Sequence, residues 1–540
     1  KVWLSNPNGL SSDMNTLNDT SNLTAYGCVG PMSGVYTIGG DNADFASIPE
    51  ANTIISYCGI NGPVELQLAP GIYENITFAG TYLGANSSNV VTFSSVPGKK
   101  DSVIFTGLTN AISITNASHL IIKDITVDAF NATYGILFSD SCSNVEIRNC
   151  NIQLDPTATA TRAGIRVYNN VTANQDIRII GNQIDGGYYG IYVYGVGQGN
   201  YAQGTVIDSN VITNAYYYGT YSYYNDFISI SHNTVESRSK NNTTTFNGIH
   251  AYYSNAERIV GNKVTSLNTA ITNPTGLYLF YLNCYDTIPV LIANNDIRIT
   301  TTGAYNGMNL SYCLADIYHN SILTLGTGAA RGIYMVYNAS YNCFFNLYNN
   351  NIVTLSTGAA SYPIYLATTT AYTADYNNYY SAGANLGYLG GARTTLATMR
   401  TYGQDMNAVN IEPDFIDLGV DMRLRKGTGL ECPRVNLFPL DIVGNSRDTI
   451  TFMGAYLENE LINNAKLVEF IEPTANSCLP GDTIQVRVVL MNRADSVLTK
   501  VDVYWTLNGV QQTMYPWTGN LLPDATDTLY LGNFVVVANE

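Results

Sequence analysis

The chain has 540 residues, a formal net charge of −16 at pH 7 and only 12% charged residues. A composition this acidic argues against nucleic acid as a partner, because phosphate binding needs a basic surface. The sequence contains no apolar run long enough to cross a membrane, which takes about 20 residues. Tyrosine is abundant, with 42 residues, and the scarcity of Glu, Lys and Leu favours strands and polar turns over helical repeats.

The N-terminal part predicts a loop followed by a helix. Residues 1–34 are rich in Asn, Ser, Thr and Gly without a period, which indicates an extended segment. The chain starts at Lys1 without an initiator Met or signal peptide, so we expect a processed or trimmed product. Asp44 is predicted to cap a helix that carries Pro49 in its first turn. The apolar side of that helix is expected to comprise Phe45, Ile48, Ile54 and Ile55, and the helix would cover the open end of the repeats that follow.

Two short strand motifs then alternate; the first recurs at steps of 25 to 31 residues, and the second keeps pace with it. One motif opens at Gly135, Gly164, Gly190, Gly219, Gly248, Gly276, Gly307 and Gly332, with Pro363 in the next slot. The other carries Asn182, Asn210, Asn233, Asn262, Asn295, Asn320, Asn350 and Asn377, with Cys150 one coil earlier. This periodicity predicts a parallel β-solenoid over about residues 64–380. We expect the asparagines to form a structural ladder, each amide bonding to the next coil at a tight turn.

Alternation along the glycine motif assigns its side chains to two faces of the strand. The expected inward pairs are Ile136/Phe138, Ile165/Val167, Ile191/Val193 and Leu277/Leu279. Two outward rows follow. The first comprises Leu137, Arg166, Tyr192, Tyr221, His250, Tyr278, Asn309, Tyr334 and Tyr365. The second comprises Ser139, Tyr168, Tyr194, Tyr223, Tyr252, Phe280, Ser311, Val336 and Ala367.

Five successive coils thus present a double aromatic row that includes Arg166 and His250. Three interpretations stay open: rings that stabilise an exposed sheet, a glycan-binding surface, or a contact with another protein or another copy of the chain.

The outward rows do not predict catalysis. A glycosidase needs two facing carboxylates about 5–10 Å apart, and the rows contain neither Asp nor Glu. Asp124, Asp128, Asp140 and Asp185 fall at expected turns. The histidines His119, His232, His250 and His319 show no metal-ligand spacing, so we predict no metal site and no cofactor, and calcium is not indicated.

Nine cysteines leave at least one unpaired within the chain. Cys28 with Cys58, and Cys432 with Cys478, are candidate disulfides at the two ends of the solenoid. Cys313 and Cys343 should stack on adjacent coils, as a disulfide or as two buried thiols.

After an irregular section at 383–435 with a short helix near 394–402, the pattern changes at about residue 465. Antiparallel strands alternate there with turns such as Pro480-Gly481 and Asn508-Gly509. A sandwich usually needs about seven strands, and about five are evident. We therefore expect the parent chain to continue; the alternative is a strand from residues 1–30 of another copy.

Several segments together carry a family resemblance. The string YTIGG, ADFASIPEA, GPVELQLAPGIY and ENITF spans 36–78, and EPDFID spans 412–417. The segment GNSRDTITFMGAYLENE, 444–460, is similar to a closing "GxxR…GAYE" motif, with Leu457 inserted between Tyr456 and Glu458. With these segments the chain resembles the secreted right-handed parallel β-helix proteins of the pectate-lyase-like superfold, in particular surface proteins of Bacteroidetes type. The C-terminal strands resemble the Ig-like modules found behind such β-helices.

The resemblance implies secretion by a type IX-like route and O-glycosylation at Asp-Ser/Thr-apolar triplets. These triplets place the candidate acceptors at Ser102, Thr287, Thr449, Thr483, Ser496 and Thr528. Hydrolases of the superfold carry paired aspartates and a Gly-His-Gly, which this chain lacks. Its lyases use a basic residue beside calcium-binding aspartates, and Arg166 is the one candidate for that base on the outward rows.

The sequence therefore predicts an all-β protein in three parts: an extended segment (1–34), a right-handed parallel β-helix with an N-terminal capping helix (35–464), and an Ig-like β-sandwich (465–540). The expected function is that of a non-catalytic extracellular or cell-surface protein, adhesin-like or structural, with a glycan, another surface protein or its own copies as partner. The alternative is a polysaccharide-binding or polysaccharide-degrading β-helix protein that uses the aromatic rows.

Overall fold

The computed structural model describes residues 2–3, 20–21, 28–139, 141–168, 174–239, 245–366, 372–418, 421–458, 463–474 and 479–537. The described residues are all-β apart from two short α-helices and a 3-10 turn, and the chain divides into two compact units. The solenoid unit comprises Lys1–Glu412 and Cys432–Ala455, and the C-terminal unit comprises Pro413–Glu431 and Tyr456–Glu540.

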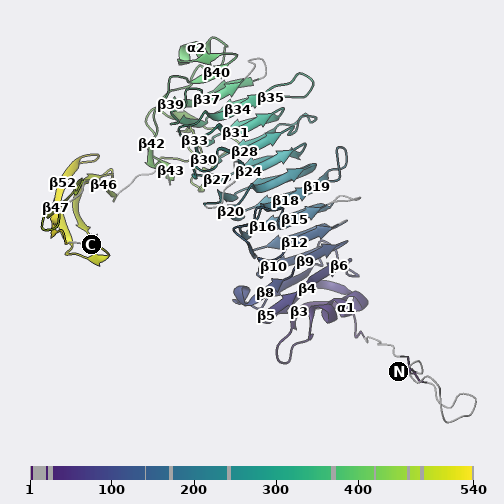
Figure 1. Cartoon of the computed structure of the whole chain (residues 1–540). Coiled ribbons are helices and arrows are strands. Elements are labelled where there is room, and N and C mark those ends of the chain that lie inside the picture. The colour runs from purple at the N-terminus through teal and green to yellow at the C-terminus, as the bar shows by residue number, and fades with distance from the viewer. Residues whose placement is uncertain are drawn as a thin grey trace, which may run out of the picture. The chain divides into compact units, whose positions relative to one another are not determined.

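Three long sheets build the solenoid unit as a parallel β-solenoid of about 12 turns (Figure 1). Sheet 1 has 14 strands: β3 (Met32–Ile38), β4 (Ile60–Leu68), β7 (Val91–Ser95), β10 (Ser118–Lys123), β13 (Ser143–Arg148), β16 (Gln175–Ile180), β19 (Ala202–Asp208), β22 (Asn225–Ser231), β25 (Asn255–Ala256), β26 (Arg258–Val260), β29 (Val290–Ala293), β32 (Leu314–Tyr318), β35 (Phe344–Tyr348) and β38 (Tyr372–Asp375).

Sheet 2 has 12 strands: β5 (Gly71–Glu74), β8 (Val103–Thr106), β11 (Thr126–Ala129), β14 (Asn151–Leu154), β17 (Gln183–Asp185), β20 (Val211–Ala215), β23 (Thr234–Ser237), β27 (Lys263–Ser266), β30 (Asp296–Thr301), β33 (Ser321–Gly326), β36 (Asn351–Thr354) and β39 (Asn378–Ser381).

Sheet 3 has 13 strands: β6 (Ile76–Ala79), β9 (Asn110–Thr115), β12 (Tyr134–Ser139), β15 (Ala163–Tyr168), β18 (Tyr189–Tyr194), β21 (Tyr218–Tyr223), β24 (Thr245–Tyr252), β28 (Asn273–Phe280), β31 (Tyr305–Ser311), β34 (Ala330–Val336), β37 (Tyr362–Leu366), β40 (Gly387–Leu389) and β41 (Ala392–Arg393). All neighbours in the three sheets pair in parallel except β40 and β41.

The remaining elements are short. They are β1 (Val2–Trp3) paired with β2 (Thr20–Ser21), the helix α1 (Ile48–Cys58), the 3-10 helix η2 (Lys100–Ser102), the helix α2 (Leu396–Arg400), and β44 (Glu431–Pro433) paired with β45 (Ile450–Phe452). Neither α-helix is long and apolar enough to cross a membrane, and the described residues contain no other α-helix.

The helix α1 begins later than predicted, so the expectation that Asp44 caps it is wrong. The Ser47 hydroxyl is the N-cap and accepts a bond from the Glu50 N–H. The Asp44 carboxylate instead accepts bonds from the backbone and hydroxyl of Thr37 in β3, at 2.8 and 2.9 Å. A carboxylate is a good N-cap only where its oxygen meets the free amides of the first turn, and the bonds to Thr37 occupy Asp44.

One continuous core fills the solenoid, and the predicted inward pairs lie in it. Ile136, Phe138, Ile165, Val167, Ile191, Val193, Leu277 and Leu279 are all fully buried. The Cys28–Cys58 disulfide ties the chain before β3 to the end of α1. Cys313 and Cys343 lie on adjacent coils as buried thiols. The proposed partner of Cys432, Cys478, lies outside the described residues.

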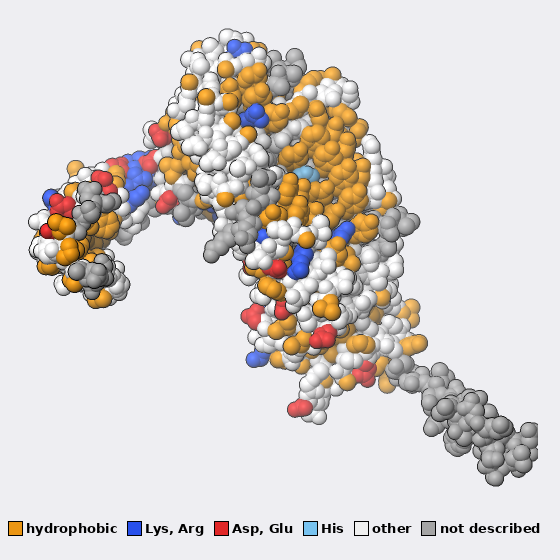
Figure 2. Space-filling model, in the orientation of Figure 1, with side chains coloured by type: hydrophobic (Ala, Val, Ile, Leu, Met, Phe, Trp, Pro, Cys, Tyr) orange, Lys and Arg blue, Asp and Glu red, His pale blue; other side chains and the backbone are white. Residues whose placement is uncertain are grey.

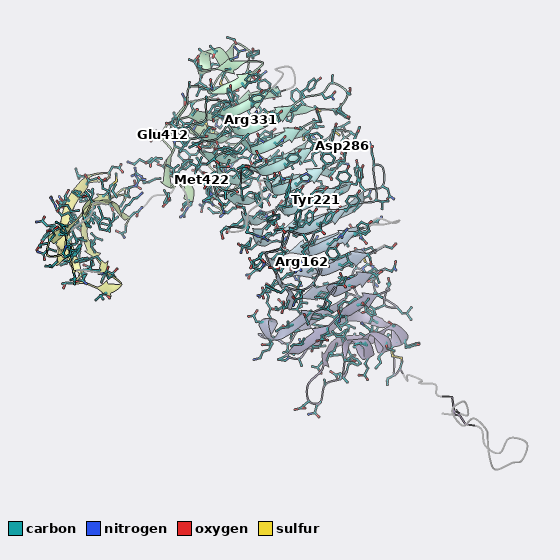
Figure 3. All side chains as sticks on the ribbon, viewed as in Figure 1. Arg162, Tyr221, Asp286, Arg331, Glu412 and Met422 are labelled. Carbon is teal, nitrogen blue, oxygen red and sulfur yellow. A yellow bond between two sulfur atoms is a disulfide. The ribbon has the colours of Figure 1, made fainter. Side chains whose placement is uncertain are left out.

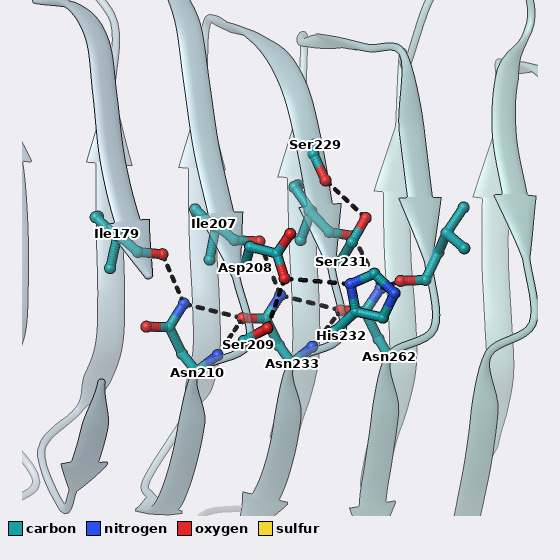
Figure 4. A network of polar contacts seen from close by, with 12 residues as sticks. Ile179, Ile207, Asp208, Ser209, Asn210, Ser229, Ser231, His232, Asn233 and Asn262 are labelled. Carbon is teal, nitrogen blue, oxygen red and sulfur yellow. Dashed lines mark hydrogen bonds and ion pairs between the residues drawn. The ribbon is translucent and has the colours of Figure 1, made fainter. Parts of the chain in front are cut away.

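The asparagine ladder runs along the turn between sheets 1 and 2. Both the backbone N–H and the side-chain amide of Asn210 donate to the side-chain oxygen Oδ1 of Asn233 at 3.0 Å, and Asn233 repeats this toward Asn262 (Figure 4). Each amide also donates to a buried backbone oxygen, such as that of Ile179 at 2.8 Å. The same bonds continue from Asn182 to Asn377. The ladder satisfies turn groups that are buried from water, and it fixes each coil in register with the next.

The ladder has distinct ends. Cys150 donates its backbone N–H to Asn182 at 2.9 Å but offers no amide of its own. At the other end the Asn377 amide donates to the Asp405 carboxylate at 3.2 Å, and the Tyr379 hydroxyl donates to it at 3.1 Å. Burial raises the pKa of Asp405 to about 7.

Arg447 explains the closing motif of the sequence, because its buried guanidinium holds residues 433–455 on the solenoid. It donates to the side-chain oxygen of Asn294 at 3.1 Å and to the Gly454 oxygen at 2.9 Å. The adjoining backbone N–H of Ala455 donates to the Ser321 hydroxyl.

The C-terminal unit consists of antiparallel strands. Its elements are β42 (Asp414–Asp417), β43 (Asp421–Lys426), β46 (Ala465–Glu472), β47 (Thr483–Asn492), β48 (Leu498–Val503), β49 (Thr506–Leu507), β50 (Val510–Gln511), β51 (Tyr515–Leu521) and β52 (Thr526–Val535). The division at 464/465 predicted from the sequence leaves β42 and β43 with the solenoid, whereas the structure groups them with the C-terminal strands. The physical reason is Arg425, which is 4% exposed and forms ion pairs with Asp414 and Asp524.

The glycine column of sheet 3 is required by packing, and this generates a stability prediction. A methyl group on Gly248 would lie 2.2 Å from the Val264 side chain and 2.7 Å from the Gly276 oxygen. We expect Gly248→Ala to lower the free energy of unfolding by about 1–3 kcal/mol through overpacking. Gly197→Ala is the matched control, because a methyl group there meets no atom within 4 Å. Urea unfolding of both variants checks this, and equal stabilities would contradict it.

Candidate functional site

The outer surface of sheet 3 brings the predicted aromatic rows together. Register pairing aligns Arg166, Tyr192, Tyr221, His250 and Tyr278 as a central row. It aligns Tyr168, Tyr194, Tyr223, Tyr252 and Phe280 as a flanking row. All ten side chains are half-buried except His250, which is 7% exposed. A broad hydrophobic patch covers this part of the solenoid unit, and Tyr221 and Arg331 lie on the same face several strands apart (Figures 2 and 3).

The rings stack on one another along the solenoid axis. His250 lies between Tyr221 and Tyr278, with ring centroids at 4.7 and 4.9 Å and interplanar angles of 11° and 6°. Tyr223 and Tyr252 in the flanking row are 5.0 Å apart at 13°. Strands about 4.8 Å apart hold equivalent rings at the distance that offset stacking prefers. His250, Tyr223 and Tyr252 therefore have both ring faces covered, whereas Tyr192 and Tyr221 meet edge to face at 85°.

Two further sets of tyrosines extend this surface and were missed by the sequence analysis. Tyr189 and Tyr218, which precede the motif glycines, stack at 5.2 Å and 6°. Tyr224, Tyr253, Tyr281 and Tyr312 form another row directly after the flanking row, with Tyr253 and Tyr281 at 4.3 Å and 5°. All four have positive φ, between 44° and 59°. Strict alternation points such residues inward, and the left-handed conformation turns them outward again. The paired tyrosines at 223–224 and 252–253 were the available signal.

We call the outward side chains of β12 to β40, together with these tyrosines, the tyrosine face. Ala367, expected in its second row, lies outside the described residues.

Arg166 is held among aromatic rings. Its guanidinium carbon lies 4.7 Å from the Tyr134 ring centroid, 4.8 Å from that of Tyr168 and 5.0 Å from that of Tyr192. The guanidinium also donates a hydrogen bond to the Tyr134 hydroxyl. Arg331 lies in the same way over Tyr334 and Tyr365. These cation–π contacts account for both arginines as structural groups.

His250 is electrically neutral at physiological pH. Burial lowers the pKa of its imidazole to about 3, since the low-dielectric stack disfavours the cation. Burial also raises the pKa of Tyr221 to about 12 and raises the pKa of Tyr192, Tyr252 and Tyr278. At physiological pH the imidazole and the tyrosine hydroxyls of this face are therefore uncharged, and Arg166 and Arg331 are its charged groups.

The groups that acid–base chemistry requires do not gather on this face. Among the described outward residues of sheet 3 none is Asp or Glu. Asp124 accepts a bond from Asn149, and Asp185 accepts bonds from Thr213 and Asn214. Asp128 accepts a bond from the Phe130 N–H, and Asp140 lies outside the described residues. Within the described ranges no group of three or more His, Cys, Asp and Glu side chains is arranged to hold a metal ion.

The solved structures to which this chain is similar include two distant ones. A rhamnogalacturonan lyase is 13% identical, with a TM-score of 0.30, over 75% of this chain and 96% of its own. A structure of XylC in complex with xylose is 10% identical, with a TM-score of 0.28, over 74% of this chain and 66% of its own. No protein-family model and no curated protein sequence matches the chain.

The buried imidazole generates a prediction about pH. The folded-state pKa of His250 lies below its ordinary value of 6.5, so its contribution to stability is complete above pH 6.5 and is lost as the pH falls toward 3. Over that range the free energy of unfolding falls by at most about 1.4 kcal/mol per pH unit because of this group. His250→Phe keeps the ring stack and removes the titration, so we expect the variant to gain stability relative to the wild type as the pH falls. Urea unfolding at pH 7 and near pH 4.5 measures this, and parallel pH profiles would contradict it.

Proposed function

We propose that this chain is a non-catalytic extracellular surface protein, adhesin-like or structural, whose tyrosine face is its contact surface. One observation carries the proposal: the ionisable groups on that face serve packing. Arg166 lies among three tyrosine rings and His250 between two, and the described outward rows contain no carboxylate. General acid–base catalysis needs a group free to exchange a proton with a substrate. The same rings form a large half-exposed apolar surface, of the kind that proteins use for recognition.

Two observations support an extracellular location. The Cys28–Cys58 disulfide fits an oxidising compartment. The six residues expected to carry O-glycans, Ser102, Thr287, Thr449, Thr483, Ser496 and Thr528, are all exposed. Export by a type IX-like route belongs to the same proposal and rests on the family resemblance.

The proposal assigns structural roles to the two ends of the chain. Helix α1 buries Ile48, Ala51 and Ile55 against the core near β3 and β4, as a solenoid cap would. In the C-terminal unit β46, β47 and β52 form one antiparallel sheet, and Trp517 from β51 packs with Val488 and Leu529. This arrangement supports an Ig-like module, and the right-handed sense of the β-helix is part of the same proposal.

Polysaccharide binding is the second candidate. The observation that favours it is the repetition of outward hydroxyl groups once per coil, which suits a linear polymer lying along the axis. Against it, sugars stack on exposed ring faces, and the inner rings have theirs covered by neighbours. Polysaccharide degradation is less well supported, because the described rows contain no pair of carboxylates.

An activity and binding screen tests the function. We expect no lyase or hydrolase activity on a panel of polysaccharides from the wild type or from Arg166→Ala. Glycan-array binding, if it uses the tyrosine face, should fall in Arg166→Ala and His250→Ala but not in Tyr57→Ala, whose side chain is 68% exposed on α1. Turnover that disappears in Arg166→Ala would overturn the non-catalytic assignment.

Intact-mass analysis of protein from its native source tests the proposed O-glycosylation. We expect added mass that maps to the exposed Asp-Ser/Thr-apolar triplets, because an attached glycan needs an accessible hydroxyl. Peptide maps showing all six sites bare would remove this part of the proposal.

A further inference from the structure

The tyrosine face is large enough for a stable protein interface. The dimensions are taken over eight of its ten strands, from β15 to β37. At about 4.8 Å per strand and about 3.3 Å per residue, six residues wide, the face measures roughly 38 by 20 Å. The resulting area of roughly 750 Å² is close to the ~800 Å² that each partner buries in a standard interface.

The charge distribution restricts what can cover this face. The whole chain has a net charge of −16. The described outward residues of sheet 3 include no acidic side chain, and their two cations, Arg166 and Arg331, contact rings. Two copies of so acidic a chain repel each other over most orientations, and this face is a place where they can meet without opposing carboxylates.

The geometry of the rings indicates the same partner. Their edges repeat along the axis at the strand spacing, with successive centroids near 5.0 Å in the flanking row. A surface with the same spacing can interdigitate with such edges over many coils. The tyrosine face of a second copy has this spacing by identity of sequence.

We propose that two copies of this chain associate through their tyrosine faces, with ring edges and hydroxyl groups of one interleaved with those of the other. This inference rests on the proposed function, which assigns the tyrosine face as the contact surface. It adds the identity of the partner: a second copy, and neither a glycan nor an unrelated protein.

Asn309 provides a conservative test, because it lies half-buried on the face between Tyr278 and Tyr334. Its side-chain oxygen accepts a bond from the Ser311 hydroxyl at 2.8 Å, which a carboxylate would also accept. Asn309→Asp therefore preserves the fold and places an unpaired negative charge in the interface. Asn144→Asp is the matched control, an identical change at an exposed position on the outer side of sheet 1.

Sedimentation velocity of the full chain, from low to high micromolar concentration, gives the readout. We expect the wild type and Asn144→Asp to self-associate alike, and Asn309→Asp to dissociate with a Kd raised at least about tenfold, since an unpaired interfacial charge costs several kcal/mol. Unchanged thermal unfolding would show that both variants fold. A wild type that stays monomeric, or association unaffected by Asn309→Asp, would overturn the inference.

The same variants distinguish a failure of the self-association inference from a failure of the proposed function. If the wild type is monomeric but binds a glycan or another surface protein in an Asn309-dependent way, the contact surface stands and the second copy is wrong. If neither association nor any binding responds to Asn309→Asp, the tyrosine face is not a contact surface, and the proposed function falls with the inference.

Discussion

In-register parallel pairing of successive coils is the constraint on which the rest of the structure depends. The asparagine ladder enforces it, because each amide bonds both to the next amide and to a buried backbone oxygen. A coil displaced by one residue would leave these groups unpaired in the core, at a cost of about 1–3 kcal/mol for each group. The glycine column adds a steric condition at the same strands, because Gly248 and its equivalents have no room for a side chain.

The aromatic surface is a consequence of that register. Equivalent positions on successive coils are about 4.8 Å apart, so rings repeated at one position contact each other, face to face as in Tyr223 and Tyr252 or edge to face as in Tyr192 and Tyr221. Stacking covers ring faces, buries His250 as a neutral group and holds Arg166 over three rings. The result is a broad neutral surface of ring edges and hydroxyl groups, which suits contact better than catalysis.

Much of the fold could be predicted because the same sequence pattern recurs in each coil of a solenoid. The inward residues Ile191 and Val193, and the register of Tyr192 with Tyr221, follow from period and alternation alone. The outward turn of Tyr224 and Tyr253 does not follow from period and alternation, because it depends on a left-handed backbone at one residue per coil. The helix start at Ser47 was missed because a rival hydrogen bond occupies Asp44. The grouping of β43 with the C-terminal strands depends on ion pairs between residues about a hundred positions apart.

The central claim is that another copy covers the tyrosine face, and residue-resolved footprinting tests it most directly. Hydroxyl-radical labelling of the full chain, read by mass spectrometry at increasing protein concentration, compares Tyr252 on the face with Tyr57 on α1. The account predicts that labelling of Tyr252 falls as the chains associate while that of Tyr57 stays constant. Equal labelling of Tyr252 at every concentration would contradict it.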